Sequence, residues 1–92
     1  MITGIFSFEI YLPYSRSLKD KRKVINKIKD KIKKYNVSIA EIDYLELWQR
    51  SKFGIAMISN DKKIIDKTFN QIKNTIENGI GFELLNIDQT YE

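Results

Sequence analysis

The hydrophobic pattern of this chain changes its period at a few sharply defined positions, and this change most constrains the fold. Residues 2–12 alternate with a period of two, which predicts a strand that buries Phe6, Phe8 and Ile10 on one face. Pro13 has no backbone N–H to donate to a neighbouring strand, so it is expected to end this one. A helical period follows at once, which means that the strand leads directly into a helix.

Residues 15–34 carry that helical period and predict a helix with one buried face. The apolar residues lie three, four and seven positions apart: Leu18, Ile25, Ile28, Ile32 and Tyr35, with Val24 at the margin. Ser15 or Ser17 is expected to cap the first turn. The helix is expected to end near Tyr35 and Asn36, because asparagine tolerates the left-handed conformation that often follows a helix.

Two further strands are predicted in the middle of the chain. Residues 37–43 are rich in β-branched side chains, which favour a strand. Residues 52–58 are nearly all apolar, which predicts a strand in the interior of a sheet. Residues 44–50, between them, are expected to form a connection or an irregular strand end.

A second helix and a last strand complete the chain. Residues 59–61 (Ser-Asn-Asp) can all cap a helix, and apolar residues at helical spacing follow over residues 64–76. Gly79 and Gly81 are expected to end this helix. Residues 82–91 have mixed polarity, which is typical of a strand at the edge of a sheet.

The predicted order is strand, helix, strand, strand, helix, strand, with no linker or internal repeat. Right-handed crossovers then predict an α+β, ferredoxin-like fold: a four-stranded antiparallel sheet with both helices on one face. The first and third strands are expected at its centre. Residues 1–92 are expected to form one ferredoxin-like domain.

The first predicted helix also carries the densest positive charge. Residues 16–34 contain ten basic and two acidic side chains, a net +8, whereas the other residues contain six basic and ten acidic ones, a net −4. The ten basic residues are Arg16, Lys19, Lys21, Arg22, Lys23, Lys27, Lys29, Lys31, Lys33 and Lys34. This asymmetry favours a polyanionic partner such as RNA, because cations that neutralise several phosphates release counterions. The alternative is a solvated face that keeps the protein soluble.

The composition argues against several classes of function. The chain has no Cys and no His, which removes disulfides, thiolate ligands, the commonest general base and the commonest transition-metal ligand. No nucleophile–base pair or nucleotide-binding loop is visible, so we expect no catalytic residue, no cofactor and no enzymatic activity. Residues 1–12 are apolar but lack a basic leader, a cleavage site and membrane-spanning length, which predicts a cytoplasmic protein without membrane association.

Glu41, Asp43 and Glu46 form an acidic cluster in the predicted second strand and the connection after it. Alternation places Glu41 and Asp43 on one face of the strand, where a hard cation such as Mg²⁺ is conceivable. The preferred interpretation is ion pairing with the basic helix or with Arg50, and no metal site is predicted.

Lys21 lies inside the apolar stripe of the first helix, and two interpretations stay open. Its aliphatic stem could pass the sheet edge and leave the charge in water. Alternatively, Lys21 could join Arg16 and Arg22 around a phosphate at the helix start, where free amides add positive potential.

Trp48, Gln49 and Arg50 combine a ring, an amide and a guanidinium, the groups that hold unpaired bases. The preferred interpretation of Trp48 is a ring that closes one end of the core. The role of Arg50 stays open between RNA contact and pairing with an acidic neighbour.

The face of the sheet without helices is predicted to serve self-association and not base stacking. RNA-recognition motifs stack bases on aromatic side chains of their sheet, but Phe6 and Phe8 are assigned here to the helix face. The open face carries Ile5, Tyr11 and one apolar set from residues 52–58. Apolar patches of this kind mark interfaces, so we expect a homodimer.

Four blocks in the chain resemble the YlxP-like family of small bacterial proteins of unassigned biochemical function. These blocks are residues 17–22 (SLKDKR), 37–43 (VSIAEID), 47–50 (LWQR) and 59–61 (SND). The resemblance implies the same ferredoxin-like fold. Members of the family are often encoded beside genes for translation initiation and ribosome maturation, which implies work near the ribosome.

The favoured hypothesis is a non-enzymatic accessory protein that binds RNA or a ribosomal subunit through its basic helix. The predicted nucleic-acid-binding residues are Arg16, Lys19, Lys21, Arg22, Lys23, Lys27, Lys34 and Arg50. The alternative is a homo-oligomeric regulatory or small-ligand-binding module with no nucleic-acid role, since domains of this fold often serve that purpose.

Overall fold

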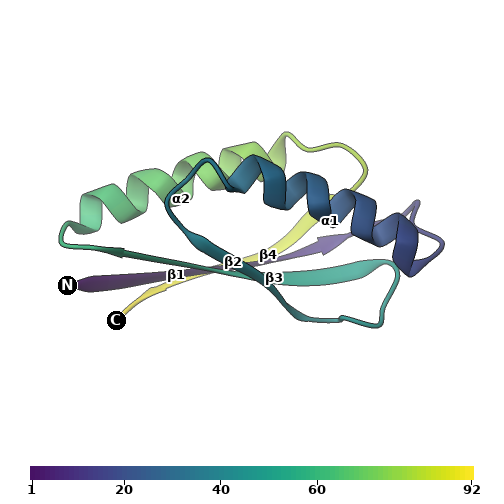
Figure 1. Cartoon of the computed structure of the whole chain (residues 1–92), viewed down its shortest axis with the longest axis horizontal. Helices are drawn as coiled ribbons and strands as arrows, with labels where there is room; N and C mark the ends of the chain where they lie inside the picture. The colour runs from purple at the N-terminus through teal and green to yellow at the C-terminus, as the bar shows by residue number, and fades with distance from the viewer.

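The computed structural model describes residues 1–92 and has four strands and two helices in the predicted order (Figure 1). The elements are β1 (Ile2–Tyr11), α1 (Leu18–Ile32), β2 (Ser38–Asp43), β3 (Arg50–Ser59), α2 (Lys62–Glu77) and β4 (Glu83–Tyr91). Arg50 therefore belongs to β3, which begins two residues before the predicted strand. The connection before it is correspondingly shorter.

The four strands form one antiparallel sheet in the order β2-β3-β1-β4. The central pair is continuous, from Ile2 opposite Ser59 to Tyr11 opposite Arg50. Both helices cover the same face of this sheet, and the other face is bare (Figure 1). The ferredoxin-like α+β fold, with the first and third strands at the centre, is confirmed.

The helix starts follow the capping signals in the sequence. The backbone N–H of Asp20 donates to the Ser17 hydroxyl (3.0 Å), so Ser17 caps α1. The carboxylate of Asp61 caps α2 in the same way. α1 ends at Ile32, earlier than predicted, because the N–H of Tyr35 donates to the Ile32 carbonyl (3.0 Å) and closes a turn instead of continuing the helix. Neither helix is long and apolar enough to cross a membrane.

The core lies between the helices and the sheet and confirms the predicted faces of β1. Phe8 is 1% exposed and stacks on Phe53 of β3, with the ring centroids 5.1 Å apart. Phe6 packs against Phe69 of α2 at 5.3 Å. Because all four aromatic rings are enclosed, none is available for base stacking on the sheet.

Candidate nucleic-acid interface

The face of α1 that points away from the core is covered by exposed cations. Ile25, Ile28 and Ile32 form the buried stripe, so basic residues at the intervening positions point to solvent. The exposed cations of this segment are Arg16, Lys19, Arg22, Lys23, Lys27, Lys31, Lys33 and Lys34. These eight residues form the α1 basic face.

Almost none of this charge is neutralised by the protein itself. Lys33 alone among the exposed cations has a carboxylate oxygen within 4.0 Å, that of Asp30 at 3.5 Å, and both partners are exposed to water. An exposed pair of this kind contributes little. The ammonium of Lys34 lies over the ring of Tyr35, 5.3 Å from the ring centroid. Because this ring is uncharged, it does not neutralise the charge of Lys34. The α1 basic face therefore presents a concentrated positive potential to a polyanion.

Lys21 is not part of the α1 basic face. Its side chain is only 2% exposed, and its Nζ lies 2.9 Å from the Glu41 carboxylate and 2.7 Å from the Tyr44 carbonyl oxygen. The hydroxyl of Ser51 donates to the same Glu41 oxygen at 2.6 Å. Neither open interpretation of Lys21 is correct, because the ammonium reaches neither water nor a phosphate: β2 and the start of the following loop enclose it.

Arg50 is also paired within the protein, on the face of the sheet that points away from the helices. Its guanidinium lies 2.6 Å from the Glu9 carboxylate and 4.7 Å from the centroid of the Tyr44 ring. The amide of Asn86 also donates to Glu9, at 3.3 Å. This cluster decides the alternative left open for Arg50 in favour of pairing with an acidic neighbour.

Six of the predicted residues are thus exposed along α1 and the residues that flank it, and two belong to ion pairs instead. The six are Arg16, Lys19, Arg22, Lys23, Lys27 and Lys34. Lys21 pairs with Glu41 and Arg50 pairs with Glu9, partners that only the tertiary fold brings within reach.

The acidic cluster of the sequence is divided in the structure. Glu41 pairs with Lys21, so the predicted ion pairing with the basic helix is confirmed for this residue. The Asp43 carboxylate accepts a hydrogen bond from the backbone N–H of Tyr44 (2.7 Å). Glu46 is exposed, and no group of three or more acidic residues converges as a metal site.

The expected role of Trp48 is wrong. The ring is 54% exposed, in the loop between β2 and β3, and does not close the core. Leu12 is fully buried at the adjoining end of β1, and its N–H donates to the Gln49 carbonyl (2.8 Å). The loop therefore holds Trp48 on the surface, while the next residue, Gln49, is bonded to the buried Leu12.

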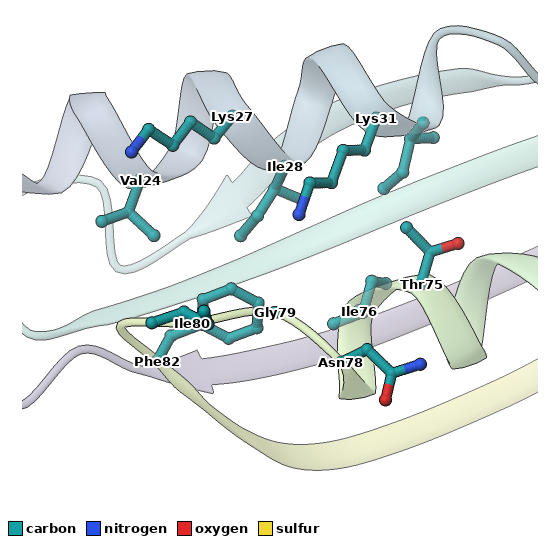
Figure 2. Close-up of a pocket in the computed structure, with 11 residues that line it drawn as sticks. Val24, Lys27, Ile28, Lys31, Thr75, Ile76, Asn78, Gly79, Ile80 and Phe82 are labelled. Atoms are coloured by element: carbon teal, nitrogen blue, oxygen red, sulfur yellow. The ribbon is translucent and has the colours of Figure 1, made fainter.

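A groove of about 240 Å³ lies between α1, the end of α2 and residues 78–82 (Figure 2). Its apolar lining consists of Val24, Ile28, Ile32, Ile76, Ile80 and Phe82. Lys27 and Lys31 of α1 line one side, and Thr75 and Asn78 line the other. Sequence patterns alone did not indicate this groove, because it needs two helix ends that lie far apart in the chain.

The four antiparallel strands and two helices define a small α+β domain of ferredoxin-like topology. A de novo designed protein, Foldit4, has the same fold, with a TM-score of 0.60 over 98% of this chain and 97% of its own. The two sequences are 14% identical, so this likeness concerns the fold alone.

The family follows from sequence comparison. The family model described as "Protein of unknown function (DUF503)" matches residues 3–89. The uncharacterized protein YlxP of Bacillus subtilis (strain 168) is 40% identical over 70 residues, which cover 75% of this chain and 76% of that protein. The chain therefore belongs to this uncharacterised, YlxP-like family, and the resemblance inferred from the four sequence blocks is confirmed.

Proposed function

We propose that this protein is a non-enzymatic accessory factor that binds RNA, in a ribosomal context, through the α1 basic face. The observation that carries the proposal is that seven of the eight exposed cations on this face have no carboxylate within 4.0 Å, the exception being Lys33. A surface kept soluble by charge can be internally paired, whereas this one leaves its charge free for an external anion.

The mechanism would be electrostatic and local to the helix. A 15-residue helix is about 22 Å long, so the α1 basic face can contact several phosphates of one RNA backbone. Each contact would release condensed counterions, which makes the affinity fall steeply with salt. The ribosomal context rests on the genomic neighbourhood implied by the family resemblance.

The test is the salt dependence of RNA binding, measured by fluorescence anisotropy with ribosomal RNA fragments. Replacing Lys19, Lys23 and Lys27 by Ala should reduce the slope of log K against log [salt] by about 0.7–0.9 for each lost contact. A matched control replaces three exposed lysines of α2: Lys62, Lys63 and Lys67. Both triple variants lose the same net charge.

The two variants separate a specific surface from a general charge effect. A reduced slope in the α1 variant alone supports the proposal. An unchanged slope in that variant, or equal reductions in both, would remove the α1 basic face from the interface. Cosedimentation of the wild-type protein with ribosomal subunits at increasing salt then tests the ribosomal context.

The alternative, a homo-oligomeric or small-ligand-binding module, is supported by two separate features. The groove between the helices combines an apolar lining with Lys27 and Lys31, which suits a small anion with an apolar body. The bare sheet face exposes Ile58, which lies diagonally across from Ile5 in the β1–β3 pair, and Ile42 of β2, which lies close to Gly54. A dimer that is insensitive to salt and indifferent to RNA would favour this alternative.

A further inference from the structure

Two exposed aromatic side chains lie at the end of the molecule where α1 begins. Tyr14, in the loop between β1 and α1, is 82% exposed, and Trp48, in the loop between β2 and β3, is 54% exposed. Both loops lie at the same end of the sheet, beside the first turn of α1 (Figure 1). Neither ring is buried by the rest of the protein, so neither serves to fill the core.

Hydrogen bonds hold these two loops together. The Gln49 side-chain amide donates to the carbonyls of Pro13 (3.4 Å) and Ser15 (3.3 Å), the residues on either side of Tyr14. The Gln49 carbonyl in turn accepts from the N–H of Leu12 (2.8 Å). Because Trp48 directly precedes Gln49, both rings are attached to backbone positions that are fixed relative to each other.

The other end of the Trp48 loop is fixed by the buried lysine. The Tyr44 carbonyl accepts from Lys21 Nζ (2.7 Å) and from the N–H of Leu47 (3.1 Å). Tyr44 itself has a positive φ of 60°, which a non-glycine residue adopts only where its surroundings hold it. The loop is thus anchored at Tyr44 and at Gln49, with Trp48 displayed between them.

The charges around the two rings favour a nucleic acid over a lipid surface. Arg16 follows Tyr14 by two residues, is exposed, and has no carboxylate within 4.0 Å of its guanidinium. Glu46 lines a shallow hollow with Trp48 and Gln49. Insertion of this loop into a membrane would carry the Glu46 carboxylate towards the acyl chains at a cost, whereas a base edge can donate a hydrogen bond to it.

We infer that Tyr14 and Trp48 form a stacking site for unpaired bases, so that the RNA bound by this protein is single-stranded at the start of α1. This inference rests on the proposed function and specifies the form of its RNA. The aromatic rings would hold bases while Arg16 and the α1 basic face hold the adjoining phosphates. Paired bases cannot use the site, because their faces are already stacked within the duplex.

Trp48 is the only tryptophan of the chain, so its intrinsic fluorescence reports directly on the site. The experiment titrates the full-length protein with a 12-nucleotide (AC)₆ RNA and, separately, with a 12-base-pair RNA duplex at the same salt concentration. We expect the single strand to quench Trp48 and to bind the more tightly. We expect the duplex to leave the Trp48 fluorescence nearly unchanged.

Substitutions then separate stacking from charge. Trp48→Ala should weaken single-strand binding about 5- to 150-fold, the range for loss of one stacked base, and Trp48→Phe should retain most of it. Leu45→Ala is the matched control, because Leu45 is an exposed apolar residue of the same loop. Both substituted positions are exposed, so the fold is expected to survive, which circular dichroism verifies.

The outcomes distinguish this inference from the function on which it rests. If Trp48→Ala binds the single strand normally while the Lys19, Lys23 and Lys27 variant does not, stacking is refuted and the α1 basic face survives. If the wild-type protein binds neither RNA, both proposals fail. Two further outcomes would overturn the inference, if RNA gives no response. A blue shift of the Trp48 emission with vesicles of anionic phospholipid would assign the loop to a lipid surface. A blue shift on raising the protein concentration alone would assign it to a second copy of the chain.

Discussion

The buried pair of Lys21 and Glu41 provides a sharp test of how this domain is held together. Lys21 is 2% exposed, whereas the Glu41 side chain is 17% exposed and also accepts a hydrogen bond from Ser51. The two residues join α1 to β2, at the edge of the sheet. Removing either partner leaves the other charge without its counter-ion, but the two remaining charges have unequal access to water.

This inequality predicts the order of the losses in the free energy of unfolding. Breaking a buried ion pair by removing one partner costs about 3–5 kcal/mol. Glu41→Gln leaves the enclosed ammonium without an anion and should fall in this range. Lys21→Met leaves a carboxylate that water and the Ser51 hydroxyl still reach, so its cost should be smaller, about 2–3 kcal/mol. The double variant Lys21→Met with Glu41→Leu should recover most of the loss, since apolar side chains often replace a buried pair at little cost.

Urea denaturation followed by far-ultraviolet circular dichroism measures these differences. With an m-value on the order of 1–1.5 kcal/mol/M for a small domain, a loss of 3 kcal/mol lowers the midpoint by about 2–3 M urea. Equal losses for the two single variants, or a larger loss for Lys21→Met, would refute the argument from unequal burial. A double variant no more stable than either single one would show that specific contacts to Ser51 and Tyr44, and not the charges, stabilise this corner.

Two other predictions follow from the packing of the core, and one follows from the bare face of the sheet. Phe8→Ala should destabilise the protein by about 3–5 kcal/mol in the same denaturation assay, because it empties the centre of the core; a loss well under 1 kcal/mol would contradict the observed face of β1. Gly4→Ala should lower the free energy of unfolding by about 1–3 kcal/mol through overpacking, since a Cβ at this position meets Ile65 of α2. A midpoint of thermal unfolding equal to that of the wild type would show that α2 can move aside without cost. Ile5→Lys should convert a homodimer to monomer without unfolding it, and sedimentation equilibrium showing only monomer for the wild-type protein at about 10–100 μM would rule the dimer out.

The secondary structure and the faces of its elements were predictable because they are properties of short segments. The alternation in residues 2–12 placed Phe6 and Phe8 under the helices, and both are buried there. The capping residues Ser17 and Asp61 also act on backbone amides only two or three residues away. Patterns of this kind need no knowledge of the rest of the chain, and the order of elements then restricts the topology to few choices.

The fate of individual polar and aromatic side chains was not predictable in this way. For Lys21 the sequence left a water-exposed charge and a phosphate contact open, but its partner Glu41 lies on a strand that the tertiary fold places beside α1. Trp48 was expected in the core, but the loop between β2 and β3 leaves its ring 54% exposed. Arg50 finds Glu9 only because β1 and β3 are neighbours in the sheet.

What the sequence determined by itself was therefore the architecture and the excess of positive charge along one helix. What only the tertiary structure decided was which of those charges remain free and which rings face water. The physical reason is that periodicity records which side of an element is apolar, whereas the solvation of a given polar or aromatic group depends on atoms contributed by segments 23 to 41 residues away.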